Sequence, residues 1–195
     1  FTSRKDIATS TLFKILMGEM EADGGTFKWG VTTSRSYLPK DHTNEFPVAD
    51  ITILEWLRQF AGKEEDDNTF LRSFLGRMLF SGEDVMKKVS VLSGGEKVRI
   101  ILSKMMLSKA NVLVLDDPTN HLDLESITAL NDGMIAFKGA LLFTSHDYEF
   151  INTTANRIIE LTPNGVVDRM ETTYEDFLAD KDVQARINAL YKEQA

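Results

Sequence analysis

Two adjacent carboxylates follow a continuous apolar run in the sequence. Asp116 and Asp117 come directly after the residues VLVL at 112–115, and such a run is typical of a strand buried on both faces of a parallel sheet. Carboxylates at the carboxyl end of such a strand lie where open α/β sheets bind ligands. We predict that Asp116 binds Mg²⁺, directly or through water, and that Asp117 orients or deprotonates an attacking water. The alternative is that both are solvated acids at a strand end, or that one caps a helix.

A histidine follows the next apolar run. His146 comes shortly after residues 140–143, ALLF, which we expect to form a second buried strand beside the first. A histidine at that place could contact a terminal phosphate and the attacking water. A lone histidine is more often structural, but this one is coupled to the acid pair, so we predict a catalytic role.

A glycine pair stands before the strongest helical pattern. Ser93, Gly94, Gly95 and Glu96 precede an apolar stripe that continues to Lys109. Two glycines let the backbone come close to a ligand, and a helix N-terminus offers free N–H groups to an anion. The alternative is an ordinary capping box, with Ser93 as the cap and Glu96 at the third position. Both can hold at once.

Ser10 and Thr11 open an apolar helical pattern, as they would after a phosphate-binding loop. That loop has the pattern G-x-x-x-x-G-K-[ST], whose last hydroxyl contacts Mg²⁺. We therefore predict that Ser10 binds metal and that Ser10 and Thr11 bind nucleotide. Ala8 and Thr9 stand where glycine and lysine belong, and Ser3 stands where the first glycine belongs.

The remaining patterns predict an α/β domain with a mainly parallel core sheet and a helical subdomain over about residues 50–108. A hairpin is expected to join strands 157–161 and 166–167 through Asn164-Gly165. The other predicted elements are a helix over 10–20 with a stop at Gly18, short strands at 26–29 and 31–33, a loop over 37–50, helical segments over 51–88 with an acidic break at 64–67, a helix over 125–137, and a C-terminal helical tail over 180–195.

Composition limits the kind of protein. The chain has 195 residues, 43% hydrophobic and 27% charged, which suits one soluble domain. The formal charge of −8 does not favour general binding to nucleic-acid phosphates. The sequence has no cysteine, which rules out disulfides and thiolate metal sites. No apolar run is long enough to span a membrane and there is no signal-peptide pattern, so we expect a cytoplasmic protein or a fragment of one.

Together these motifs resemble the ATP-binding-cassette ATPases. LSGGE at 92–96 resembles the signature motif, VLVLDD at 112–117 the Walker B strand, residues 120–123 the D-loop, and His146 the switch histidine. DPTNHLDLESI, with SGGEKVR before it, is similar to the ABC-F subfamily, and the segments KWGVTTSRSYLPKD and YEDFL resemble its second, C-terminal cassette. The resemblance implies a P-loop NTPase fold in a soluble protein with two cassettes, of a kind that often acts on the ribosome.

The resemblance also implies how the site works. In this family two cassettes face each other head to tail, and each ATP with its Mg²⁺ lies between the Walker motifs of one and the signature of the other. Ser93, Gly94, Gly95 and Glu96 would then serve a nucleotide held by a partner cassette. Asp116, Asp117 and His146 would serve the nucleotide held by this one.

Several departures from the family pattern bear on activity. Thr9 cannot supply the lysine charge, Ala8 adds a methyl group where backbone must approach phosphate, and Asp6 would bring a negative charge near the phosphates. Arg35 is assigned to the place of the glutamine that contacts magnesium, and Asp117 replaces the usual glutamate. The strands that precede the phosphate loop in cassettes are expected to be missing before Phe1.

Two functions remain open from these patterns. The first is an ATP-hydrolysing cassette of an ABC-F-type protein, associated with translation. The second is an interaction module that does not hydrolyse ATP, because its own loop is defective, and that supplies LSGGE to a partner cassette.

Overall fold

The structure, a computed structural model, describes residues 1–41, 45–46, 50–62, 65 and 67–192. Parts of three predicted segments lie outside the described residues. They are positions 42–44 and 47–49 of the predicted loop, Glu64 and Asp66 of the acidic break, and the last three residues of the tail.

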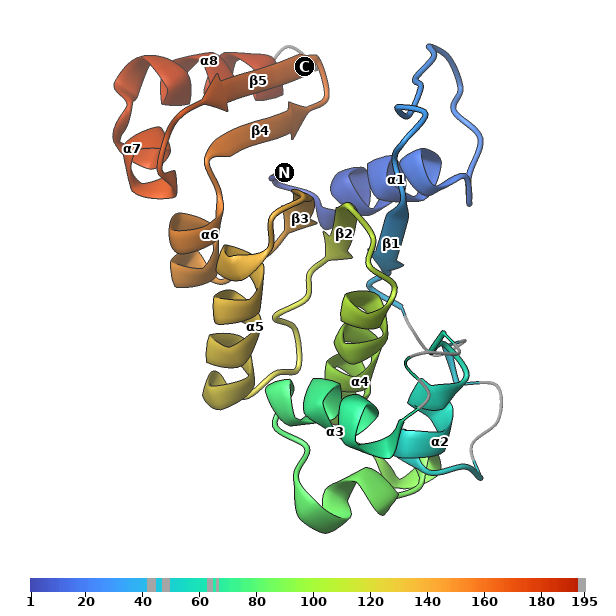
Figure 1. Cartoon of the computed structure of the whole chain (residues 1–195). Helices are drawn as coiled ribbons and strands as arrows, with labels where there is room; N and C mark the ends of the chain where they lie inside the picture. Colours follow the sequence, from blue (N-terminus) through green and yellow to red (C-terminus); the bar gives the residue numbers. More distant parts are fainter. Residues whose placement is uncertain (42–44, 47–49, 63–64, 66, 193–195) are drawn as a thin grey trace.

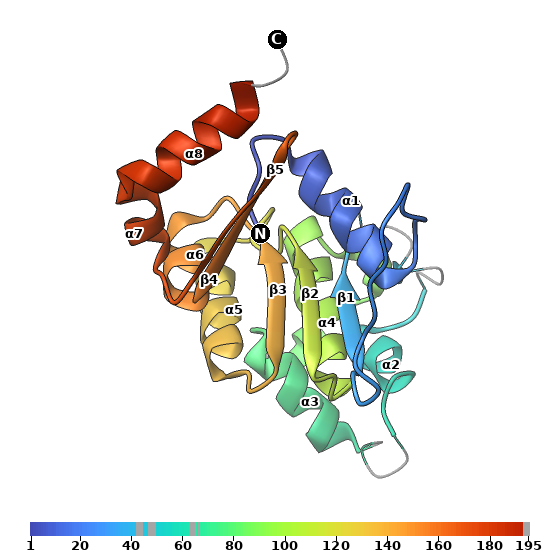
Figure 2. The same cartoon turned by 90° about the horizontal axis from the view of Figure 1, so that it is seen from above.

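A parallel sheet of three strands forms the centre of the domain, in the order β1-β2-β3. Strand β2 (Val112–Asp116) lies between the other two and is buried at every position. It pairs with β1 (Arg35–Leu38) on one side and β3 (Ala140–Thr144) on the other. The sheet confirms the predicted α/β fold, and it brings the carboxyl ends of the three strands to one edge (Figure 2).

Strand β1 corrects two predictions about residues 26–50. Tyr37 and Leu38 were expected to begin a loop, but they pair with Val114 and Leu115 of β2. The strands expected at 26–29 and 31–33 do not form, since neither segment joins a sheet in the described structure. The β-branched and aromatic side chains in these segments have no partner strand in the described structure. The Trp29 indole N–H donates to the Leu16 carbonyl at 3.0 Å, and Val31 is almost fully exposed.

Strand β3 is less buried than its apolar sequence predicted, because it has a strand neighbour on one side only. Of its residues only Phe143 is buried. The predicted hairpin is confirmed, with β4 (Arg157–Thr162) antiparallel to β5 (Gly165–Met170), but it forms a separate sheet. The first residues of the chain lie between the two sheets. The Phe1 amino group donates to the Phe143 carbonyl at 2.7 Å, and Thr2 forms a parallel bridge to Glu160 of β4.

Helices cover both faces of the central sheet. Helix α1 (Asp6–Met17) covers one face, where Phe13 packs against Val112 and Val114. Helix α4 (Gly94–Leu107) belongs to the larger core on the other face, together with the predicted helical subdomain (Figure 1). That subdomain contains α2 (Ile53–Arg58), α3 (Asn68–Arg77) and two 3₁₀ helices, η2 (Gly82–Met86) and η3 (Val89–Val91).

The C-terminal tail packs on its own domain. Helix α8 (Lys181–Lys192) buries Val183 and Ile187 against the hairpin, and the Tyr191 hydroxyl donates to Glu160 Oε1 at 2.9 Å. The remaining helices in the C-terminal half are α5 (Leu124–Ala136), α6 (Tyr148–Thr154) and α7 (Tyr174–Ala179).

Candidate nucleotide site

The carboxyl end of β2 carries a buried acid with an unsatisfied oxygen. Asp116 is 2% exposed, and its Oδ2 atom has no hydrogen-bond partner in the described structure. Burial raises the pKa of this carboxyl, and the nearby Ser10 hydroxyl is the largest opposing influence. A buried polar atom without a partner is costly. The Oδ2 atom of Asp116 is therefore available to accept a further ligand.

A magnesium ion fits this pair of side chains. Mg²⁺ takes carboxylate and hydroxyl oxygens and completes its shell with substrate phosphates and water, and Asp116 and Ser10 are side chains of those types. No group of three or more His, Cys, Asp or Glu side chains that could hold a metal occurs in the described part of the chain. A metal bound by Asp116 and Ser10 would therefore need phosphate oxygens among its other ligands.

Asp6, Lys40 and His146 converge beside Asp117 at the same edge of the sheet. Lys40, just after β1, places its Nζ atom 3.0 Å from Asp6 Oδ2 and 3.4 Å from Asp117 Oδ2. His146, after β3, places Nε2 at 3.1 Å from Asp6 Oδ1. We call Asp6, Lys40, Asp117 and His146 the Asp6 cluster. The predicted catalytic residues Asp117 and His146 are thus brought together, but through an acid and a lysine that were not predicted to join them.

The segment expected to form a phosphate loop is helical instead. Helix α1 begins at Asp6, four residues before the predicted start at Ser10. Thr9, in the place of the lysine, is buried, and its hydroxyl donates to the Asp6 carbonyl at 2.8 Å. Residues 6–9 include no glycine, and ordinary residues lose less conformational entropy in a helix than glycine does. The first turn of α1 therefore replaces the open backbone cradle that ATP phosphates require.

The assignment of Arg35 to the magnesium-contacting position is wrong. Arg35 begins β1, at the far end of the strand from the acids, where its guanidinium lies 5.2 Å from the Trp29 ring. Lys40 is the residue that reaches the acids, because it follows the carboxyl end of β1. Sequence reasoning missed Lys40 because it predicted a loop over residues 37–50. The apolar pair Tyr37-Leu38 was the signal that a strand ends there.

The signature segment begins α4 with a capping box. The Ser93 side chain accepts a hydrogen bond from the Glu96 N–H at 3.2 Å, and the Glu96 carboxylate accepts one from the Ser93 N–H at 2.9 Å. Ser93 and Gly94 are exposed, and Gly95 and Glu96 are half-buried. In the described structure no hydrogen bond or ion pair joins this segment to Asp116, Asp117 or His146. Both alternatives for the segment, cap and ligand-facing helix start, are therefore compatible with its geometry.

Close packing explains why position 95 is a glycine. A Cβ atom added there would lie 2.7 Å from the His121 carbonyl oxygen, in the loop that follows β2. A Cβ added at Gly94 would lie 3.8 Å from the His121 Cβ, which is an ordinary contact. Close approach of two backbone segments thus requires glycine at only one of the two positions.

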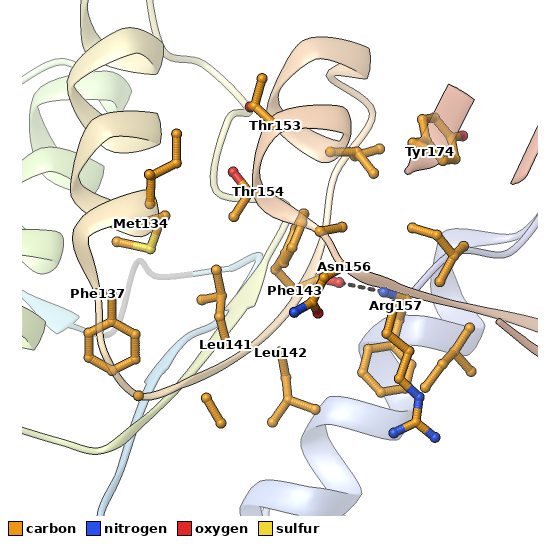
Figure 3. A pocket seen from close by; sticks show the side chains of 18 of the residues that line it. Met134, Phe137, Leu141, Leu142, Phe143, Thr153, Thr154, Asn156, Arg157 and Tyr174 are labelled. Carbon is orange, nitrogen blue, oxygen red and sulfur yellow. Dashed lines mark hydrogen bonds between the residues drawn. The ribbon is translucent and has the colours of Figure 1, made fainter. Parts of the chain in front are cut away.

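A cavity of about 610 Å³ lies elsewhere, along the edge of β3 that faces β4 (Figure 3). Its walls include Phe137, Leu141, Phe143 and Tyr174. Among the described residues, none that was predicted to bind nucleotide, metal or the attacking water lines it. The cavity, whose lining also includes Thr153, Asn156 and Arg157, is therefore separate from the predicted site.

The fold and these residues define the class of protein, an α/β domain of the P-loop NTPase type. The sequence family described as ABC transporter matches residues 9–120, more than half of the chain. The chain belongs to this family, as an ATP-binding-cassette domain.

Relatives and solved structures agree with this family. The chain is 62% identical over 193 residues to "Uncharacterized ABC transporter ATP-binding protein YkpA" of Bacillus subtilis (strain 168), covering 99% of this chain and 35% of that protein. It is 35% identical to "ABC transporter F family member 2" of Arabidopsis thaliana, covering 94% of this chain and 26% of that protein. Its relatives thus include ABC-F-type proteins. The chain spans about a third of the length of the first of these and about a quarter of the second.

Solved cassette structures share the fold. The complex of archaeal ribosomal stalk protein aP1 and archaeal ribosome recycling factor aABCE1 contains a chain that matches with a TM-score of 0.71 at 23% identity. That match covers 92% of this chain and 35% of that one. "RNase-L Inhibitor" matches with a TM-score of 0.72 at 22% identity, over 93% of this chain and 36% of that one. None of the helices in the described part of the chain is long and apolar enough to cross a membrane.

Proposed function

We propose that this chain is the second, C-terminal cassette of an ABC-F-type ATPase that binds and hydrolyses ATP between two cassettes paired head to tail. In that pair the chain offers Ser93, Gly94, Gly95 and Glu96 to the ATP and Mg²⁺ held by the partner cassette. The observation that carries the proposal is the exposed start of α4, which is shaped to contact an anion and, in the part of the chain that the structure describes, has no bond to the chain's own acid pair.

The chemistry of the α4 start supports this role. A helix of 14 residues carries a partial positive charge at its N-terminus, with N–H groups free to meet phosphate oxygens. The negative charge of Glu96 would oppose an anion, but this carboxylate is already bound by the Ser93 N–H and lies 3.4 Å from Lys87 Nζ. The hydroxyl of Ser93 and the backbone of Gly94 remain exposed on the outer side.

Two candidates differ over the chain's own half of the nucleotide site. The helical first turn of α1 and the buried Thr9 favour a half-site that does not hydrolyse ATP. The unpartnered Oδ2 atom of Asp116 beside Ser10 favours one that binds Mg²⁺-ATP, with Asp117 and His146 acting on the attacking water. We favour the first candidate, because the phosphate cradle does not fit while a magnesium ligand alone holds no nucleotide.

Association of cassettes tests the proposal directly. We expect the chain to form a complex with a partner cassette chosen because it carries the phosphate-loop lysine, when Mg²⁺-ATP is present. Light scattering coupled to size-exclusion chromatography would measure it, with Mg²⁺-ADP as the control. A complex that forms equally with ADP, or no complex with ATP at any practical concentration, would contradict the proposed pairing.

Substitution of Asp117 separates the two candidates. In a protein with both cassettes, Asp117→Asn removes the group that would accept a proton from water, and such groups contribute roughly 10²–10⁴-fold to a rate. We expect steady-state ATP hydrolysis to change less than about twofold, because the partner's half-site does the chemistry. A fall of tenfold or more, with ATP affinity unchanged, would instead assign hydrolysis to this chain's own acids.

The ribosome is the proposed partner of the whole protein, which we place in the cytoplasm. Support comes from the ABC-F-type relatives and from a structural neighbour that is described as a ribosome recycling factor. The charge of −8 gives this chain no general attraction to RNA. Contacts with the ribosome would therefore be expected mainly from other parts of the protein.

A further inference from the structure

We infer that the Asp6 carboxylate acts as an internal substitute for the terminal phosphate of ATP and holds the chain's own half-site closed to nucleoside triphosphates. This rests on the proposed function, in which the chain's own half-site is the weak one. It adds to that proposal the residue that excludes the nucleotide, Asp6, and the group that this residue replaces, the terminal phosphate.

Both oxygens of the Asp6 carboxylate are engaged by nitrogen atoms of side chains at this edge of the sheet. Oδ2 lies 3.0 Å from Lys40 Nζ and Oδ1 lies 3.1 Å from His146 Nε2. A carboxylate that bridges two donors presents them with two anionic oxygens, as a phosphate would. An incoming phosphate would therefore have to displace Asp6 before it could reach either donor.

The charges at this edge of the sheet make that displacement unfavourable. Asp6, Asp116 and Asp117 face the lysine Lys40, which forms ion pairs with two of them. The hydrogen-bonded ion pair with Lys40 is the main reason that the pKa of Asp6 lies below its ordinary value, so this acid carries its charge at neutral pH. A phosphate added here would meet three carboxylates, and the acid that it released would stay nearby with its negative charge.

The backbone holds the carboxylate in place. Asp6 is the first residue of α1, where a negative charge is stabilised by the helix dipole. Its carbonyl accepts the Thr9 hydroxyl at 2.8 Å, and Thr9 is buried. The Asp6 cluster thus joins the start of α1 to the ends of β1, β2 and β3, and a triphosphate would have to displace Asp6 from both Lys40 and His146.

The substitution Asp6→Asn tests this inference, because it keeps the side-chain size and removes the charge. In titrations of the whole chain with fluorescent ATP and ADP analogues plus Mg²⁺, we expect ATP affinity to rise about tenfold and ADP affinity less than about threefold. Half-exposed ion pairs contribute modestly, which limits the expected gain. Asp23→Asn is the matched control, since Asp23 is an exposed acid with no ion pair in the described structure.

A second readout follows the contact itself. The ring resonances of His146 in NMR spectra should shift in Asp6→Asn and stay in place in Asp23→Asn, without any nucleotide. Unmoved His146 resonances would overturn the inference, as would a lack of any gain in ATP affinity. An equal gain for ATP and ADP would also overturn it, because Asp6 would then act as a general charge and not against the terminal phosphate. These outcomes leave the cassette-pairing experiment unaffected, so the two proposals can fail separately.

Discussion

Replacing Gly95 by alanine is expected to lower the free energy of unfolding of the chain by about 1–3 kcal/mol and to reduce ATP hydrolysis by the paired protein about 100-fold. The added Cβ would stand 2.7 Å from the His121 carbonyl oxygen. The positions of the Cβ atom and of the carbonyl oxygen are both fixed by the backbone. Neither atom can therefore rotate out of the contact as the end of a flexible side chain could. The start of α4 or the loop after β2 must therefore shift. A shift of the α4 start would also displace Ser93 from the phosphates of the nucleotide that the partner cassette holds.

Gly94→Ala is the matched control for this prediction. Its Cβ would make an ordinary contact at 3.8 Å from the His121 Cβ, so the free energy of unfolding should change by less than about 0.5 kcal/mol. Urea denaturation of the isolated chain measures both variants, and steady-state hydrolysis by the two-cassette protein measures function. Equal stability of the two variants would contradict the close approach of His121. Full hydrolysis with a destabilised Gly95→Ala would contradict the role of the α4 start.

Restoring the phosphate-loop residues should have the largest effect on nucleotide binding. The triple substitution Asp6→Gly, Ala8→Gly, Thr9→Lys removes the competing acid and supplies a lysine charge. It also places two glycines in the first turn of α1, each of which disfavours the helix by about 1 kcal/mol relative to alanine. Charge-assisted hydrogen bonds contribute about 1.5–3 kcal/mol each, so we expect ATP affinity to rise about 10³-fold, well beyond Asp6→Asn alone.

The control for the triple variant keeps both glycines and replaces Thr9 by methionine, which has nearly the length of lysine without its charge. Isothermal titration calorimetry with Mg²⁺-ATP would compare them. Equal affinity of the lysine and methionine variants would show that opening the turn, and not the charge, restores binding. No gain in either would show that residues 6–9 are not what limits nucleotide binding, and would rule out the defective loop as its cause.

The elements that sequence predicted well are those with strong local signals. Strand β2 was readable because it is apolar at every position before its final acid, as a central parallel strand must be. The start of α4 was readable because Ser93 and Glu96 form a capping box within four residues. The hairpin was readable from the dipeptide Asn164-Gly165, a local turn signal, and the positive φ angle of Gly165, 151°, suits glycine.

The errors came where the outcome depends on partners that are distant in the sequence. Residues 26–33 have strand-forming side chains but no strand beside them in the described structure, while the short β1 exists only because β2 pairs with it. Arg35 and Lys40 are both cations near one strand, and only the direction of that strand decides which of them meets the acids. Asp6 could be named as an unfavourable charge from sequence, but its two partners could not.

The sequence by itself determined the family, through motifs whose order and spacing agree with it: the glycine pair that begins α4, the acids at the end of β2 and the histidine after β3. Only the tertiary structure decided which of these residues the first turn of α1 contacts. Local preference made that turn helical, because it has no glycine. The sheet then brought Lys40 and His146, far apart in the sequence, to the same carboxylate, because parallel strands end at one edge and ion pairs form between whatever charges meet there.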